Sequence, residues 1–152
     1  MKVAVGSDHA GFALKEAVKR ELEALGHEVV DRGTDSAEVS VDYPDYSIAV
    51  GEDVAAGRVE RGVVVCATGI GASIAANKVA GVRASVVTSD LTAQLTRQDN
   101  DSNVLAVGAK TAPSVNEVLG WLRIWLATPF AEGRHERRVD KIRDYEAHHL
   151  KP

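Results

Sequence analysis

Short apolar runs alternate along the chain with longer segments in which apolar residues recur at helical spacing. Residues 3–5 form the first run. After a polar turn comes a segment whose apolar face consists of Leu14, Val18, Leu22 and Leu25. Gly26 follows at a position where a left-handed residue commonly ends a helix. The pattern predicts a strand, a turn and a helix, in that order.

The same order returns along the rest of the chain. Further strands are expected at residues 27–30, 62–66, 82–87 and 104–107. Further helices are expected at residues 45–57, 68–78, 88–100 and 134–149, and in a segment that begins at Ser114 and carries Val118, Leu122 and Leu126. The strand at residues 62–66 is apolar throughout, as central strands of parallel sheets are.

Five strand–helix units in succession predict a parallel sheet with helices on both faces. We therefore expect an α/β fold, a three-layer α/β/α Rossmann-like sandwich with a five-stranded parallel sheet. A length of 152 residues suits a single domain over residues 1–152, with a C-terminal helical tail from about residue 130.

Charge and cysteine content narrow the function classes. The chain has 18 Lys and Arg against 22 Asp and Glu, a net charge of −4, and no basic stripe suited to nucleic acid. Cys66 is the only cysteine, which fits a reducing compartment. The first apolar run is too short for a signal peptide, and no stretch approaches the roughly 20 apolar residues of a membrane helix. We expect a cytoplasmic protein without nucleic-acid or membrane partners.

Ligands of such sheets bind beyond the carboxyl ends of the strands. The strongest signal there is residues 66–73, Cys-Ala-Thr-Gly-Ile-Gly-Ala-Ser, which join a buried strand to the unpaired N–H groups of a helix start. Gly69 and Gly71 let the backbone approach a ligand, and the positive end of the helix favours an anion and a thiolate at Cys66. The alternative is a structural cysteine with glycine-rich packing behind it.

Two other groups of polar residues are open to two interpretations each. Asp8 and His9 follow the first strand and could bind sugar hydroxyls or a phosphate, or Asp8 could simply cap the first helix. Arg134 and Arg138 lie one helical turn apart and could clamp a phosphate. They could equally belong to a solvated mixed-charge helix, since acidic residues run beside them at Glu132, Glu136, Asp140 and Asp144.

Residues 97–103 are dense in polar groups just before a strand. Such a segment is ordinarily a helix exit, but Asp99 and Asn100 could reach a ligand that another strand-end loop holds. No Cys and His set has metal-ligand spacing, and no G-x-S-x-G elbow occurs. Metal-dependent and serine-hydrolase functions are therefore not expected.

Six segments together resemble ribose-5-phosphate isomerase type B in order and spacing. They are GSDHAGF at 6–12, DYP at 42–44, CATGIG at 66–71, AANK at 75–78, RQDND at 97–101 and GRH at 133–135. This family includes enzymes for other phosphorylated sugars, among them galactose-6-phosphate isomerase subunits. The resemblance implies a homodimer, with a tetramer as the alternative, whose active sites lie between subunits and use no metal or organic cofactor.

The resemblance also implies residue roles. Cys66 would be the base, assisted by Thr68, and the backbone N–H groups of residues 69–73 would hold the enediolate oxygen. Arg134 and Arg138 would bind the phosphate. The residues implied to contact substrate are Asp8, His9, Tyr43, Ala67, Gly69, Ile70, Gly71, Ala72, Ser73, Asn100, Lys110, Arg134 and Arg138.

Two positions depart from the family pattern. Asp99 stands where these isomerases usually have the histidine assigned to opening the furanose ring, so Asp99 or Asp8 would have to take over that proton transfer. Lys110 stands where an arginine is usual, which keeps the charge but loses the bidentate fork.

The leading hypothesis is interconversion of ribose 5-phosphate and ribulose 5-phosphate through an enediolate. A tetrose 4-phosphate is the first alternative, because its O4 is esterified and it forms no furanose ring to be opened. A larger sugar phosphate is the second. From another class, the chain could be a non-catalytic sugar-phosphate-binding module, but such a module has no need of a thiol at Cys66.

Overall fold

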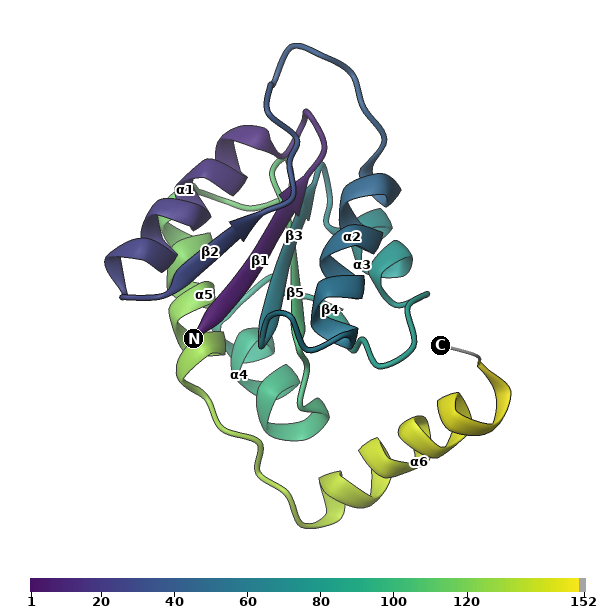
Figure 1. The fold of residues 1–152 in the computed structure, drawn as a ribbon. Helices are drawn as coiled ribbons and strands as arrows, with labels where there is room; N and C mark the ends of the chain where they lie inside the picture. The colour runs from purple at the N-terminus through teal and green to yellow at the C-terminus, as the bar shows by residue number, and fades with distance from the viewer. Residues whose placement is uncertain (151–152) are drawn as a thin grey trace.

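The computed structural model describes residues 1–150, in which strands and helices alternate along most of the chain (Figure 1). The elements are β1 (Lys2–Ser7), α1 (Phe12–Ala24), β2 (Glu28–Asp31), α2 (Tyr43–Ala55), β3 (Arg61–Cys66), α3 (Ile70–Ala76), β4 (Ala84–Val86), α4 (Asp90–Asn100), β5 (Val104–Gly108), α5 (Val115–Ala127) and α6 (Arg134–His149). The strands pair in parallel in the order β2-β1-β3-β5-β4.

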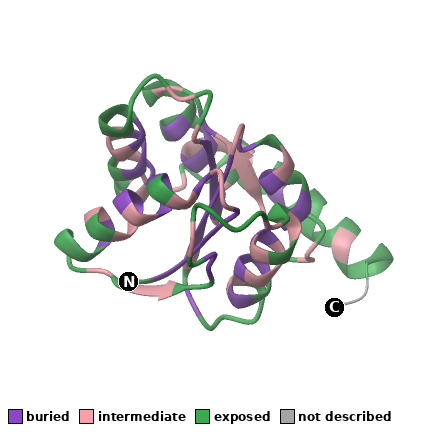
Figure 2. Cartoon of the chain, turned by 90° about the horizontal axis from the view of Figure 1, so that it is seen from above, coloured by how far each residue is buried: buried purple, intermediate pink, exposed green. Residues whose placement is uncertain are grey.

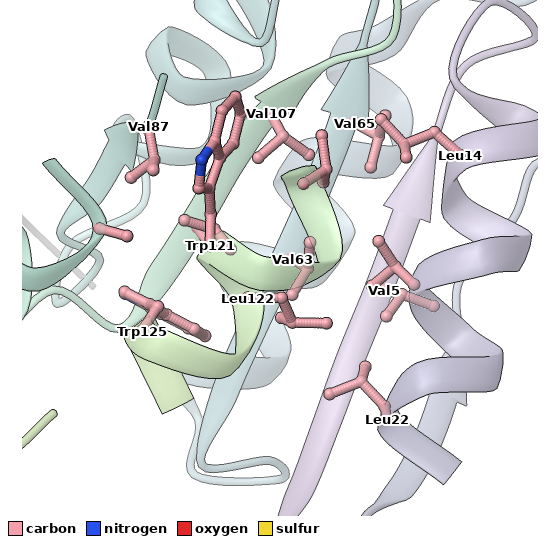
Figure 3. Packing of buried hydrophobic residues seen from close by; sticks show 14 of the residues in the cluster. Val5, Leu14, Leu22, Val63, Val65, Val87, Val107, Trp121, Leu122 and Trp125 are labelled. Carbon is pink, nitrogen blue, oxygen red and sulfur yellow. The ribbon is translucent and has the colours of Figure 1, made fainter. Parts of the chain in front are cut away.

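Helices cover both faces of this sheet. One cluster of buried apolar residues joins the sheet to α1, α4 and α5, and it includes Trp121, Leu122 and Trp125 of α5 (Figure 3). A second cluster joins the opposite face to α2 and α3. Buried residues lie in the strands and on the sheet-facing sides of the helices (Figure 2). The predicted three-layer α/β/α sandwich and its five-stranded parallel sheet are confirmed, with β3 central between β1 and β5.

Among the element boundaries that differ from the prediction, the end of α3 and the bounds of β4 are neighbours in the chain. α3 ends at Ala76, before residue 78, because the Asn77 side chain bonds both the N–H and the carbonyl oxygen of Ala84 and directs the chain into β4. β4 covers only residues 84–86 of the predicted 82–87, since it is an edge strand that pairs with β5 alone.

Strand order reverses between β1 and β3. From β1 the chain runs outward to β2 and then crosses to β3 on the other side of β1. Loops that leave two such strands at their carboxyl ends diverge around a crevice. Asp8 follows β1 and Cys66 ends β3, so both lie at this crevice.

The last helix, α6, lies apart from the sheet near the amino ends of the strands (Figure 1). It packs against α4, and Val139 is its buried residue. The N–H of Gly81, just before β4, donates to Glu146 of α6 at 3.1 Å. Among the helices described in residues 1–150, none has the length and apolar character that a membrane crossing requires.

Candidate active site

Cys66 sits at the carboxyl end of the central strand β3 and is 4% exposed. The backbone N–H of Gly69 donates to its Sγ at 3.1 Å. Gly69 has a left-handed φ of 77°, and a Cβ there would lie 2.9 Å from the carbonyl carbon of Val107. Both facts require glycine at this position. The turn therefore places a backbone donor on the sulfur, and a thiolate accepts such a bond more strongly than a thiol does.

Not all N–H groups of the turn are available to a ligand. The N–H of Ile70 donates to Thr68 Oγ1 at 3.2 Å, and the N–H of Ser73 donates to the carbonyl oxygen of Gly69 at 3.0 Å. The N–H groups of Gly71 and Ala72 have no hydrogen-bond partner within residues 1–150. Of the predicted donors at residues 69–73, these two are the ones left for a ligand oxygen.

Tyr43 of α2 packs against the same turn. It begins α2, two residues before the predicted start. Pro44 is tolerated there because a residue in the first helical turn has no partner for its N–H inside the helix, so the missing N–H costs nothing. A Cβ on Gly71 would come within 2.5 Å of Tyr43 Cζ, so the phenol ring covers the backbone of Gly71. The side chain is 38% exposed. Tyr43 therefore borders the free N–H groups while remaining accessible to a ligand.

The loop after β1 packs over the end of β3. Asp8 is 7% exposed, and its Oδ1 accepts the N–H of Gly11 at 3.0 Å. A Cβ on Gly11 would lie 2.8 Å from the carbonyl oxygen of Val65, which precedes Cys66. Gly11 itself is the N-cap of α1 and has no side-chain cap, so Asp8 closes the turn before the helix instead of capping it.

His9 is held by the long loop between β2 and α2. Its Nδ1 lies 3.1 Å from the backbone N and 3.2 Å from the carbonyl oxygen of Val41. Arg32, at the start of that loop, pairs with the buried carboxylate of Asp53, which also accepts from Arg58 at 2.7 Å. The hydrogen bond from Arg32, joined by the one from Arg58, outweighs burial and lowers the pKa of Asp53.

The loop after β5 completes this group of residues. The N–H of Lys110 donates to the carbonyl oxygen of Ala67 at 2.8 Å, and the N–H of Ala109 donates to that of Cys66 at 2.9 Å. Lys110 is thereby fixed beside the thiol-bearing turn. We call the residues gathered at the carboxyl end of the sheet the thiol cluster: Asp8, His9, Tyr43, residues 66–73 and Lys110.

The remaining predicted site residues lie at the other end of the sheet. Asp99 and Asn100 end α4, which runs from the carboxyl edge back to the amino edge, about 16 Å for its 11 residues. The carbonyl oxygen of Asn100 accepts from Arg83 Nε at 3.0 Å, just before β4 begins. Near them, Arg134 and Arg138 are exposed on α6. We call Asp99, Asn100, Arg134 and Arg138 the arginine cluster. Within one chain this cluster lies at the opposite end of the sheet from Cys66.

Sequence reasoning assigned no role to two residues that the structure ties to these clusters. Val41 holds His9 through its backbone, which carries no side-chain signal. His135 lies with its Nε2 3.4 Å from Asp99 Oδ1. Its place beside Arg134 could have drawn attention to it. Arg97, in contrast, is 6% exposed and bonds Asp101, Ser102 and Thr128, so it is structural.

The thiol lies beside free backbone donors in the crevice of a doubly wound parallel sheet, where α/β proteins bind small ligands, and free N–H groups at a helix start suit an anionic one. Comparison with known proteins narrows this class. The profile of the ribose/galactose isomerase family matches residues 3–142. The chain belongs to this family.

Individual relatives are similar over nearly the whole length. Ribose-5-phosphate isomerase B of Escherichia coli is 45% identical over 141 residues, 93% of each chain. A solved structure of Clostridium thermocellum ribose-5-phosphate isomerase B superposes with a TM-score of 0.94 at 44% identity, covering 97% of this chain and 99% of that one. The Mycoplasma genitalium isomerase with bound ribulose-5-phosphate gives 0.92 at 36% identity, covering 96% of each chain.

Proposed function

We propose that this aldose–ketose isomerase interconverts ribose 5-phosphate and ribulose 5-phosphate through an enediolate, with Cys66 as the base. Family membership defines the reaction class. The substrate is inferred from relatives that are named ribose-5-phosphate isomerase B and are 35–45% identical to this chain. The structure of one such relative holds ribulose-5-phosphate. The observation that carries the mechanism is the buried Cys66 sulfur, 3.1 Å from the Gly69 N, in the sheet crevice.

Isomerisation needs one base that removes the proton from C2 of the aldose and returns it to C1. The negative charge that develops on the intermediate's oxygen needs donors that are already in place. Cys66 supplies the base, and the free N–H groups of Gly71 and Ala72 supply the donors. Thr68 Oγ1, which accepts from Ile70, keeps its own proton available to the same oxygen.

The active site is completed by a second copy of the chain. Lys110 is the lysine of the thiol cluster, whereas Arg134 and Arg138 belong to the arginine cluster at the other end of the sheet. Large apolar side chains are exposed on α3, which begins in the thiol cluster, and on α4, namely Ile70, Ile74, Leu91 and Leu95. Exposed apolar side chains of this size are suited to burial against another protein surface. A homodimer that covers these helices would bring one chain's arginines to the other chain's thiol.

The remaining parts of the proposal follow from the same chemistry. An enediolate mechanism with a thiol base and backbone donors requires no metal or organic cofactor. A single reduced cysteine used as a base fits the cytoplasm. The chain would act as one domain over residues 1–152.

One observation favours a second candidate substrate. Asp99 stands where the family usually has its ring-opening histidine, and a tetrose 4-phosphate forms no furanose ring. Turnover on a panel of four-, five- and six-carbon sugar phosphates separates the two. We expect the highest kcat/KM on ribose 5-phosphate. A preference of about tenfold or more for erythrose 4-phosphate, roughly 1.4 kcal/mol, would replace it with the tetrose.

A further inference from the structure

Ribose 5-phosphate in its furanose form has to open before C2 can lose a proton, and ring opening is an acid–base reaction. The carboxylates of Asp99 and Asp8 were the two candidates for this step. The structure shows that Asp99 does not stand alone: its Oδ1 lies 3.4 Å from Nε2 of His135. Carboxylate and imidazole together form a more capable acid–base unit than a carboxylate alone, because histidine exchanges its proton near neutral pH.

The two side chains come from different helices that several contacts hold together. Asp99 lies in the last turn of α4, and His135 in the first turn of α6. The N–H of Ala131 donates to the carbonyl oxygen of Gln98 at 3.1 Å, and Arg143 of α6 reaches Asp101 at 3.4 Å. These contacts fix the start of α6 on the end of α4. The Asp99–His135 distance is therefore set by the fold on both sides.

The imidazole also has one free nitrogen. Its side chain is 17% exposed, and Nδ1 has no hydrogen-bond partner within residues 1–150. The Asp99 carboxylate faces Nε2 at 3.4 Å, so Nε2 is the nitrogen placed to donate to it, and Nδ1 is the nitrogen left to face a ligand. Asn100 is next to Asp99 in α4, and Arg134 and Arg138 share the first part of α6 with His135. The Asp99–His135 pair therefore belongs to the region that carries the residues implied to bind the sugar phosphate.

We propose that His135 is the acid–base group that opens the furanose ring, and that Asp99 is its positioning residue. This inference rests on the proposed function, including the second copy that carries the arginine cluster to Cys66. In the step, the C1–O4 bond breaks with its electron pair going to O4, which takes a proton from the His135 imidazolium. The anomeric O1–H pair becomes the C1=O π bond, its proton passes to water, and neutral His135 regains a proton from solvent.

Two reactions of the same enzyme separate ring opening from C2 chemistry. Net conversion of ribose 5-phosphate requires an open ring. Exchange of the C1 proton of ribulose 5-phosphate with D2O does not, because this ketose has its O5 esterified and forms no furanose. We expect His135→Asn to lower kcat for ribose 5-phosphate about tenfold or more while C1 exchange stays within about twofold of wild type. Asp99→Asn should show the same split with a smaller loss.

Matched variants test the assignment further. Glu136→Gln, at the next and exposed position of α6, should leave both rates at the wild-type level. Asp99→His combined with His135→Asn should recover conversion of ribose 5-phosphate, because it supplies an imidazole from the neighbouring position.

The results that would overturn the inference are distinct from those that would overturn the proposed function. Equal losses in both reactions for His135→Asn would show that the residue only places α6, and unchanged conversion of ribose 5-phosphate would show that it has no role. Either result leaves the isomerase proposal standing. A wild-type enzyme inert in both reactions would remove the proposed function, and this inference with it.

Discussion

The thiol cluster and the arginine cluster are built in different ways. Cys66 ends a strand that is buried from Gly62 onward. A Cβ on Gly69 would lie 2.9 Å from the Val107 backbone, and one on Gly71 would lie 2.5 Å from the Tyr43 ring, so the turn is closely packed on both sides. Arg134 and Arg138 instead project from an exposed helix whose buried residue is Val139. The residues proposed to react therefore lie in the buried core, and the residues proposed to hold the phosphate lie on a peripheral helix, α6. Only assembly of two chains would join them.

Mixing two inactive variants tests this division most strongly. Cys66→Ala lacks the proposed base, and the double variant Arg134→Ala with Arg138→Ala lacks the proposed phosphate clamp, so each variant alone should be nearly inactive. A heterodimer has one intact site, made of the thiol of one chain and the arginines of the other. After co-refolding in equal amounts, about a quarter of wild-type activity should return by random pairing. Mixtures no more active than their components would show that each chain uses its own arginines, or none.

Single arginine variants measure what each arginine of α6 contributes to phosphate binding. Arg134→Ala or Arg138→Ala should weaken binding of the transition state for ribose 5-phosphate by roughly 1.5–3 kcal/mol, the range of a charge-assisted contact. The loss is measured as the fall in kcat/KM. Activity on unphosphorylated ribose should change little. If ribose and ribose 5-phosphate lost equally, the arginines would be structural parts of a mixed-charge helix.

The packing of the core turn is tested at Gly71. A methyl group there would displace the Tyr43 ring, so Gly71→Ala should lower kcat/KM about tenfold through misplaced donors. Gly120→Ala in α5 is the control, since its Cβ would meet only the end of Arg123 at 3.9 Å. That variant should keep full activity and gain up to about 1 kcal/mol of stability. Full activity in Gly71→Ala would mean that Tyr43 and the free N–H groups do not act together.

The smallest expected effect concerns the loop that holds His9. Asp53 has its pKa lowered by the hydrogen bond from Arg32, so its ion pair stabilises the fold above the ordinary carboxylate pKa and loses that effect as pH falls through the lowered value. Asp53→Asn should cost about 1–3 kcal/mol in urea unfolding at pH 7, with little change in kcat. The difference from wild type should shrink below about pH 4. A difference independent of pH would assign the stability to packing.

Much of the fold could be predicted because the residues that are buried are mostly apolar, so their spacing along the chain shows which elements they belong to. The strand at residues 62–66 and the helix that begins at Ser114 both followed from that pattern, and Ser114 Oγ does accept the N–H of Glu117 at 3.1 Å. The early end of α3 could not be predicted. It depends on a side chain, that of Asn77, bonding a backbone seven residues away.

The site was predictable in its residues more than in its arrangement. Glycines at 69 and 71 indicated a close backbone approach, but their partners, Val107 and Tyr43, are tertiary neighbours. Asp99 was expected to reach a ligand held by another strand-end loop. Within one chain it lies at the opposite edge, because α4 runs the length of the sheet, and its pairing with His135 joins segments 36 positions apart.

The most direct test of the account is the rate of C1 proton exchange of ribulose 5-phosphate in D2O with Cys66→Ala, because exchange isolates the proton transfer assigned to the thiol. The variant should keep the circular dichroism spectrum and the oligomeric state of the wild type, since only one small side chain is shortened. Exchange and kcat on ribose 5-phosphate should both fall about 10²–10⁴-fold, the usual contribution of a general base. Retention of more than about half of either rate would show that Cys66 is not the base.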